Sequence, residues 1–417
     1  MTTVFDRLVG QHAVVAELTS AAIAAAQLAA TRERESHGQA PAEVPDGPRH
    51  GSSAMTHAWL FTGPPGSGRS VAAQCFAAAL QCEVADAPGC GRCHACTTVM
   101  AGTHSDVRRI VPEGLSIGVK GMRDIVQTAS RRPSVGRWQV VLIEDADRLT
   151  EAAGNALLKA VEEPPPRTVF LLCAPSIDPE DISVTLRSRS RHVPLVMPSA
   201  TAISEVLIAQ DAIEPGLAQW AASVCGGHVG RARRLATDQQ SRDERTQALG
   251  LARAATSNAR AYQAAEELVK SAEAAAKLIS AKLDEAETEE MRTALGAGGT
   301  GKGSAGALRG SAGILKDLEK RQRSRQTRTS RDLLDRALVD LAALFRDALA
   351  ASYGAGVVAM HPDMAEQTQG MARYASREEL LTCVEAVLEC REVLGLNVKP
   401  KFAVDAMVAK IGMALRH

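Results

Sequence analysis

The sequence predicts an α/β domain with a buried parallel sheet, followed by regions that are helical throughout. An apolar run at residues 59–61 leads into a glycine-rich turn and then into a small-residue helix pattern. A second apolar run, at residues 138–143, ends in two carboxylates. Residues 331–417 carry amphipathic helix patterns. Strands that alternate with helices are typical of a parallel sheet covered by helices, whereas the C-terminal pattern predicts helices packed on helices.

Composition restricts the class of protein before any motif is considered. A chain of 417 residues is long enough for two or three domains, and its 48 basic residues balance its 48 acidic ones. Net charge therefore gives no sign of nucleic-acid binding. The longest apolar run, around residues 21–30, is shorter than the roughly 20 residues of a membrane-spanning helix, and no secretory signal is recognised. We expect a cytosolic protein whose nine cysteines are reduced, metal-bound or buried.

The N-terminal part predicts one helix and one insertion before the first strand. Residues 4–30 give a turn at 8–10 and then an apolar helix pattern. Residues 31–56 change abruptly to charged residues, Pro, Gly and Ser, a composition without a core-forming pattern. We therefore expect a flexible insertion over 31–56.

The glycine-rich turn resembles the phosphate-binding P-loop. The pattern G-x-x-x-x-G-K-[ST] is matched at Gly63, Gly68 and Ser70, but Arg69 stands at the lysine position. In such a turn, backbone N–H groups and the helix dipole converge on a phosphate. The predicted nucleotide-binding residues are thus Gly63, Gly66, Gly68, Arg69 and Ser70, in an altered form of the motif.

Four cysteines follow the P-loop helix with the spacing C-x7-C-x2-C-x2-C. They are Cys82, Cys90, Cys93 and Cys96, in a segment rich in Gly. Pairs of thiolates on short turns are the ligands of structural Zn²⁺. The alternatives are core cysteines clustered by chance, or His94 in place of one cysteine. We predict a structural zinc module over residues 82–105, because no ligand position is left open for catalysis.

The second apolar run ends in Glu144 and Asp145. A buried parallel strand that delivers acids beside a P-loop is typical of a Walker B strand, whose acids hold Mg²⁺ and orient water. The alternative is an ordinary strand followed by solvated acids. Further along, the pattern predicts a helix at 150–163, a strand at 169–173 and an arginine-bearing segment at 184–191. These elements together indicate an α/β nucleoside-triphosphatase fold.

The remaining chain is expected to be helical apart from one insertion. Residues 199–240 give short helices, and residues 243–284 are rich in Ala, Glu and Lys. A second flexible insertion is predicted over 285–330, because residues 296–310 are of low complexity. Gly296 to Lys302 imitates the start of a P-loop, but no strand precedes it. The basic stretch 316–331 is interpreted as a solvated face, with nucleic-acid contact as the alternative.

Several of these motifs occur together in one known family. The chain resembles the clamp-loader branch of the AAA+ proteins, which serves bacterial DNA polymerase III. The resemblance depends on LVGQ at 8–11, the P-loop, the four-cysteine insert, NALLK with EEPP at 155–165, and TLRSRSR at 185–191. It covers residues 4–30 and 56–240. It implies an AAA+ α/β domain at 1–196, a helical lid at 197–240 and a helical collar for oligomerisation at 241–417.

The resemblance also implies partners and a role in DNA replication. The expected partners are the other clamp-loader subunits, of the tau/gamma motor type and the delta type, in a hetero-pentamer. The sliding clamp and primed DNA would be reached through that complex, and no membrane is involved. The subunit would help ATP-driven loading of the clamp, and it has no polymerase active site of its own.

Departures from the family pattern predict weak or absent ATPase activity. Motor subunits carry Lys where this chain has Arg69, and Asp-Glu where it has Glu144-Asp145. The arginine that the lid usually supplies aligns with Gly230. Binding of ATP or ADP stays open, because an arginine can still pair with phosphate.

The family's Ser-Arg-Cys motif is represented here by Ser188-Arg189-Ser190. The resemblance assigns Arg189, with Ser188 beside it, as an arginine finger that acts on the ATP of a neighbouring motor subunit. The residues alone also fit a solvated basic turn. Two further alternatives are an active AAA+ motor ATPase of the same clamp loader and a DNA-binding zinc module on a helical scaffold.

Overall fold

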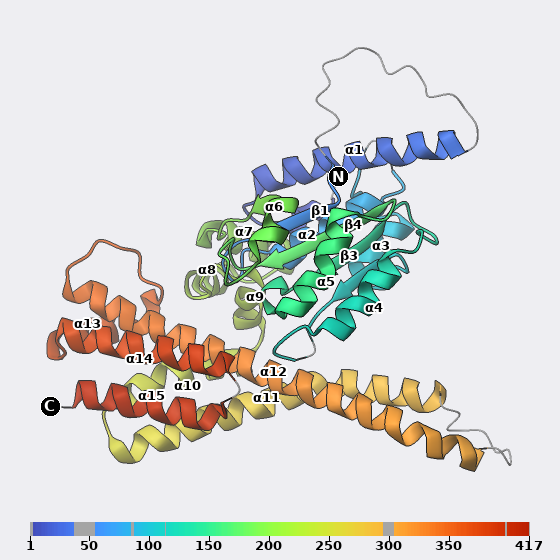
Figure 1. Cartoon of the computed structure of the whole chain (residues 1–417). Helices are drawn as coiled ribbons and strands as arrows, with labels where there is room; N and C mark the ends of the chain where they lie inside the picture. The colour runs from blue at the N-terminus through green and yellow to red at the C-terminus, as the bar shows by residue number, and fades with distance from the viewer. Residues whose placement is uncertain are drawn as a thin grey trace. The chain divides into compact units, whose positions relative to one another are not determined.

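The computed structural model describes residues 3–36, 55–84, 87–112, 114–294, 304–396 and 398–416. It divides into two compact units (Figure 1), which are described separately below. The first contains Met1–Pro112 and Ser116–Arg233, and the second contains Glu113–Leu115 and Arg234–His417. The predicted lid helices up to Arg233 thus lie in one unit with the α/β core.

The first unit contains a five-stranded sheet in the order β2-β3-β4-β1-β5. Every paired strand is parallel, which confirms the predicted α/β class. The strands β1, β3 and β4 are buried along their whole length, as their continuous apolar runs predict. The strand bounds are β1 Ala58–Thr62, β2 Val107–Ile110, β3 Gln139–Ile143, β4 Thr168–Ala174 and β5 Arg191–Pro194.

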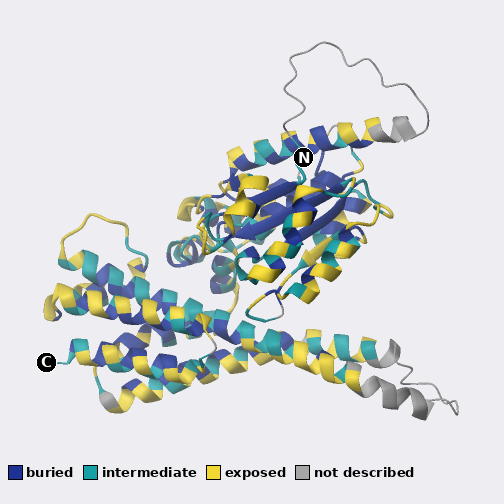
Figure 2. Ribbon diagram, in the orientation of Figure 1, coloured by how far each residue is buried: buried dark blue, intermediate teal, exposed yellow. Residues whose placement is uncertain are grey.

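Helices cover both faces of this sheet (Figures 1 and 2). One face, which includes Trp59 and Phe61, forms a core with α1 and α2, and the other, which includes Leu60 and Leu172, forms a core with α4 and α5. Alternate residues of β1 therefore belong to different cores, as the period of a strand requires. The helices of this layer are η1 Val4–Arg7, α1 His12–Ser36, α2 Arg69–Gln81, α3 His94–Ala101, α4 Val119–Ala129, η2 Ala146–Arg148, α5 Glu151–Glu162 and α6 Val184–Arg189.

Helix α1 differs from two expectations. It continues to Ser36, so the start of the predicted insertion 31–56 is helical, and residues 37–54 lie outside the described part of the chain. Its His12–Thr31 segment has a mean hydropathy of 1.6. By length and composition alone, this segment is long and apolar enough to cross a membrane. The expectation that no run reaches this length was wrong. Leu18 and Ala25 of the same segment are fully buried in the core, which is the ordinary use of such a helix in a folded domain.

Three short helices follow the sheet within the predicted lid. They are α7 Ala200–Asp211, α8 Pro215–Val224 and α9 Val229–Thr237. The link from β5 to α7, and the turn before α9, bring this region to the P-loop, as described below. The unit boundary falls inside α9, at Arg233.

The second unit is helical throughout its described residues, around one hydrophobic core. It consists of α10 Gln239–Ala254, α11 Asn258–Ala294, α12 Ser304–Ser352, η3 Pro362–Met364, α13 Ala365–Tyr374, α14 Arg377–Gly395 and α15 Pro400–Leu415.

The long helices α11 and α12 correct the flexible insertion predicted over 285–330. Both helices continue into this range, and only residues 295–303 between them, with the imitation P-loop, lie outside the described residues. Arg325 of α12 pairs with Asp284 and Glu287 of α11, at 2.7 Å to the Glu287 Oε2 atom. The basic stretch of α12 is therefore partly neutralised by acids of the facing helix.

Candidate functional site

The P-loop turn connects β1 to α2 and depends on glycine at three positions. Gly63, Gly66 and Gly68 have φ values of 152°, 93° and 92°, a region that residues with a Cβ rarely adopt. Gly68 is the N-cap of α2, and Arg69 is the first helical residue. The backbone thus has the strand–turn–helix context that the sequence pattern requires.

Neighbouring segments lie directly against this turn. A Cβ on Gly66 would be 2.7 Å from the Cα atom of His228, just before α9, and one on Gly63 would be 2.5 Å from the Leu195 carbonyl oxygen. The Gln11 side-chain amide also donates to the Ser67 carbonyl oxygen at 3.3 Å and to the Val196 carbonyl oxygen at 2.5 Å. The turn is therefore packed between the N-terminal segment, the β5–α7 link and the lid.

Two polar atoms at the turn are buried without a hydrogen-bond partner in the described part of the chain. They are the Ser67 Oγ and one terminal nitrogen of Arg69. Ser67 is only 2% exposed. Buried donors without a partner cost about 1–3 kcal/mol, so such atoms call for an explanation. A hydroxyl and a guanidinium nitrogen at a glycine-rich turn fit an anionic group such as a phosphate.

The acidic residue that follows β3 forms an ion pair with the edge strand β2. Arg109 of β2 forms an ion pair with Glu144, whose side chain is 13% exposed. The Glu144 backbone N–H also donates to the Ile110 carbonyl oxygen at 3.1 Å. Glu144 is thus held towards β2 by an arginine that the sequence analysis did not single out.

Asp147 is a further acid of this region that sequence reasoning missed. It lies in η2, two residues after Asp145, and the only signal was the D-x-D spacing at 145–147. Burial, followed by the nearby Asp145 charge, raises the pKa of Asp147, against the opposing effect of Arg148 and Arg69. The structure therefore brings Arg69 within electrostatic reach of this acidic group, although Asp147 itself sits outside the predicted site.

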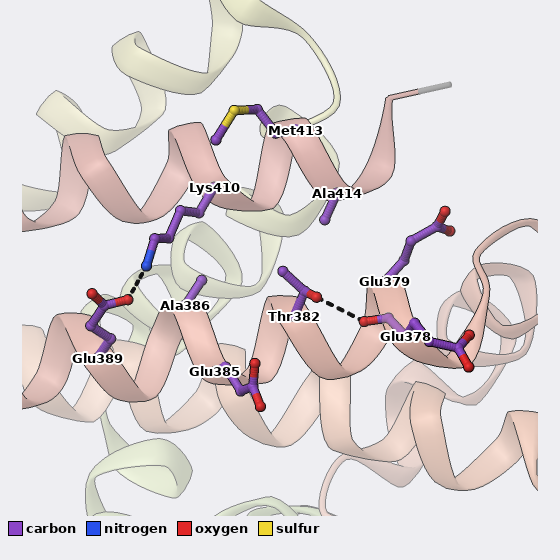
Figure 3. A pocket seen from close by; sticks show the side chains of 9 residues that line it. All are labelled: Glu378, Glu379, Thr382, Glu385, Ala386, Glu389, Lys410, Met413 and Ala414. Atoms are coloured by element: carbon purple, nitrogen blue, oxygen red, sulfur yellow. Dashed lines mark hydrogen bonds and ion pairs between the residues drawn. The ribbon is translucent and has the colours of Figure 1, made fainter.

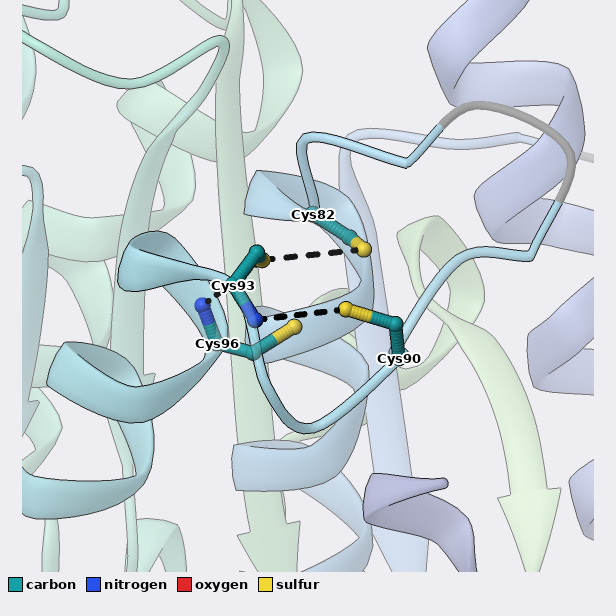
Figure 4. Close-up of side chains that lie close together, drawn as sticks. All are labelled: Cys82, Cys90, Cys93 and Cys96. Atoms are coloured by element: carbon teal, nitrogen blue, oxygen red, sulfur yellow. Dashed lines mark hydrogen bonds between the residues drawn. The ribbon is translucent and has the colours of Figure 1, made fainter. Parts of the chain in front are cut away.

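The four predicted zinc ligands come together in one cluster (Figure 4). Their Sγ atoms all lie within 4.8 Å of one another, and the Cys82 and Cys93 sulfurs are 3.9 Å apart. Sulfurs about 2.3 Å from a tetrahedral Zn²⁺ are separated by ~3.8 Å, so this spacing fits the metal. Cys82 caps the end of α2 and Cys93 the start of α3. The cluster can hold a metal ion.

Backbone N–H groups donate to two sulfurs of this cluster. The Cys93 N–H donates to the Cys90 Sγ, and the Cys96 N–H to the Cys93 Sγ, both at 3.4 Å. Burial opposes ionisation of Cys90, but the N–H groups of Arg92 and Cys93 lower its pKa to about 7. Burial raises the pKa of Cys93 and of Cys96 in the same cluster, and it raises that of Cys383, in the second unit, to about 12. The N–H···S bonds thus favour the thiolate at Cys90, the form in which cysteine binds metal.

Arg189 lies at the C-terminal end of α6 and is well exposed. Its Nε atom is 2.8 Å from the Glu162 Oε1 atom, at the C-terminal end of α5. One terminal nitrogen donates to the Thr185 carbonyl oxygen at 3.3 Å and to the Ser188 Oγ at 3.2 Å. The partners described for Arg189 thus come from α5 and α6, and Ser188 contacts it directly.

A separate groove lies between α14 and α15 of the second unit and contains none of the predicted site residues (Figure 3). Its volume is about 450 Å³, and Lys410 pairs with Glu389 across it. Four of its nine lining residues are glutamates, and the full lining comprises Glu378, Glu379, Thr382, Glu385, Ala386, Glu389, Lys410, Met413 and Ala414.

Comparisons with known proteins relate the first unit to replication proteins. Residues 50–198 match the family described as DNA polymerase III, delta subunit. The chain is 38% identical over 160 residues to DNA polymerase III subunit delta' of Pseudomonas aeruginosa, which covers 38% of this chain and 48% of that protein. It is 36% identical over 165 residues to subunit delta' of Escherichia coli, covering 38% and 49%. Subunit tau of Bacillus subtilis is 39% identical over 140 residues, covering 33% and 24%.

Among solved structures, a gamma subunit-related protein of Thermotoga maritima covers 87% of this chain and 95% of its own, with 16% identity and a TM-score of 0.38. That score is too low to support any conclusion about this chain. The matched segment spans about half the length of the delta' relatives, 48% and 49% in the two cases above. Over this segment, the chain is similar to the delta-prime proteins of DNA polymerase III.

Proposed function

We propose that this chain is a clamp-loader subunit that assists a neighbour's ATPase and has little or none of its own. It would assemble with tau/gamma-type motor subunits and a delta subunit in a hetero-pentamer, with the second unit as its collar. The complex would load the sliding clamp onto primed DNA in the cytoplasm, at the replication fork. Kinship with delta' and tau proteins over the α/β segment supports this assignment.

The Arg109–Glu144 ion pair is the observation that carries the non-catalytic role. Glu144 stands at the strand end where a motor subunit needs an acid for Mg²⁺ and water. In this chain, the Glu144 carboxylate is instead ion-paired with Arg109 on the adjacent strand. Three parts of a hydrolysis site are then altered: the P-loop lysine is Arg69, the lid arginine is Gly230, and the strand-end acid Glu144 is paired with Arg109.

A bound ATP or ADP would be held by the P-loop backbone of Gly63, Gly66 and Gly68, with Arg69 and Ser70 beside it. The nucleotide would supply an anion for the buried donors that lack a protein partner, Ser67 Oγ and the Arg69 nitrogen. Glu144 and Asp145 complete this degenerate site. Its role would be structural, since binding would fix the turn, α9 and the β5–α7 link against one another.

A Zn²⁺ ion would be held by Cys82, Cys90, Cys93 and Cys96, with no ligand position left for chemistry. His94 is exposed and is not in the cluster of facing sulfurs. The ion would fix the ends of α2 and α3, and the two N–H···S bonds would help to stabilise the sulfurs of Cys90 and Cys93 as ligands.

Arg189 is the residue we assign to catalysis in trans. A guanidinium placed against a neighbour's γ-phosphate neutralises the charge that develops in the transition state. Exposure at the end of a helix suits such a contact, although it equally suits a solvated turn. An arginine in a solvated turn would not contribute to the ATPase activity of the complex, so the two roles can be distinguished by measuring that activity.

The test is reconstitution with motor and delta subunits, clamp and primed DNA. Arg189→Ala should leave assembly unchanged on size exclusion and lower the DNA-stimulated ATPase by the share of the one site that loses its finger. Arg187→Ala is the matched control, since Arg187 is an exposed arginine of the same helix. Equal rates for the Arg189→Ala and wild-type complexes would refute the finger.

The alternative, an active motor ATPase, is supported by the intact Gly63, Gly68 and Ser70. It is tested on the isolated chain. Turnover well above that of a variant lacking residues 63–70 would favour the motor, whereas equal background rates favour the assisting subunit.

A further inference from the structure

Two acidic residues end helix α5, where the helix dipole disfavours them. Glu162 is the last helical residue and Glu163 the C-cap. The C-terminus of a helix carries partial negative charge, so carboxylates there are locally unfavourable. Helix stability does not explain Glu162, and a contact outside the helix does, because its carboxylate meets the Arg189 Nε atom at 2.8 Å.

The contacts of Arg189 use two of its three nitrogens. Nε pairs with the Glu162 carboxylate, while one terminal nitrogen donates to the Thr185 carbonyl oxygen and to the Ser188 hydroxyl. Within the described residues, the other terminal nitrogen makes no hydrogen bond. A long side chain that is held at two points loses most of its rotamer freedom before it meets a ligand.

We propose that Glu162 is a positioning residue for Arg189: it holds the guanidinium so that its remaining terminal nitrogen is presented to an anionic oxygen of a neighbouring subunit's nucleotide. This inference rests on the proposed function, since it requires that Arg189 act in trans. Because the Arg189 side chain is already ordered, its conformational entropy is not lost when the subunits associate. Ser188 has a supporting part, because its hydroxyl fixes the opposite edge of the guanidinium.

The experiment uses the reconstituted complex and a double-mutant cycle. Glu162→Ala should lower the kcat of the one ATPase site that Arg189 serves about fivefold, the factor that corresponds to an exposed ion pair of about 1 kcal/mol. The KM for ATP should stay the same, because the nucleotide is bound by the neighbour. Glu162→Gln, which keeps an acceptor oxygen, should have a smaller effect. Glu163→Ala is the matched control, an exposed carboxylate one residue along.

The decisive variant carries both Glu162→Ala and Arg189→Ala. It should be no slower than Arg189→Ala alone, because Glu162 acts only through that arginine. A purely structural loss would instead add to the Arg189→Ala effect or reduce assembly on size exclusion. Either of these results overturns the inference, as does an unchanged or increased rate for Glu162→Ala.

The two proposals fail in different ways. If Arg189→Ala leaves the ATPase unchanged, the finger is refuted, and Glu162 loses its role with it. If Arg189→Ala lowers the rate while Glu162→Ala does not, the finger stands and only the positioning role is refuted.

Discussion

Removal of the proposed zinc ion gives a prediction whose size follows from the contacts of the cysteine loop. Cys90→Ser replaces one of four thiolates with a hydroxyl, which is a poor Zn²⁺ ligand. The Val4 N–H donates to the Gly89 carbonyl oxygen at 2.9 Å, next to Cys90 in the chain. Val4 and Phe5 are each 3% exposed and belong to the sheet core. Loss of the ion should release the loop and the N-terminal turn together.

The cost of that release can be estimated from the two side chains. Burial of a Val or Phe side chain contributes ~1.5–3 kcal/mol, so exposure of both would lower the free energy of unfolding by ~3–6 kcal/mol. For a unit of this size, each kcal/mol moves the Tm by about 2–4 °C. The expected fall is on the order of 10 °C. The sheet itself should survive, because most of its core lies outside this contact.

The assay combines metal content with thermal unfolding. Mass spectrometry should find one zinc per chain in the wild-type protein and none in the Cys90→Ser variant. The Tm of the variant should be lower by the amount estimated above. His94→Ala is the matched control and should keep both zinc and Tm, because His94 is exposed within the same module. Metal-free wild-type protein of unchanged Tm would refute the zinc module. Loss of zinc in His94→Ala alone would refute the four-cysteine ligand set.

Three further predictions concern the nucleotide, the second unit and pH. ADP should raise the Tm of the wild type in a thermal-shift titration but not that of Arg69→Ala, because the variant lacks the half-buried guanidinium that would pair with the phosphates. Equal shifts would contradict this. Asp363→Ala should destabilise the second unit by ~3–5 kcal/mol in urea unfolding, since Arg245, 6% exposed, loses its 2.8 Å partner; an effect under 1 kcal/mol would contradict it. Burial lowers the pKa of His361 and of His104 in the folded state. The unfolded chain therefore binds more protons, and stability should fall as pH drops below about 6.5, less steeply in His361→Gln.

The central elements of the first unit were predictable because their signals are local. The strands β1, β3 and β4 are short continuous apolar runs, and the turn at Gly63 to Gly68 can be recognised from spacing alone. The edge strand β2 was missed, since Arg108 and Arg109 break any apolar pattern. It is a strand because it pairs with β3, and this pairing is not visible in its own four residues.

The insertion over 285–330 was misjudged for a related reason. The low complexity of residues 296–310 and the basic residues that follow, considered alone, predict a flexible, solvated segment. The structure pairs Arg325 with Asp284 and Glu287, about 40 residues earlier in the chain. Local composition describes each helix separately, whereas its stability comes from complementary charge and apolar contact across the pair.

The site shows the same limit, and it bears on what a P-loop pattern means. Gly66 and Gly63 face the His228 Cα atom and the Leu195 carbonyl oxygen so closely that no side chain fits, whether or not a nucleotide is present. Packing alone therefore requires the glycines, and their pattern can persist in a subunit that does not hydrolyse ATP. Arg69 and Glu144 depart from the motor pattern, and they are the residues that our proposal makes responsible for the loss of hydrolysis. Glycine spacing thus identifies the fold of this turn, while the charged residues beside it determine its chemistry.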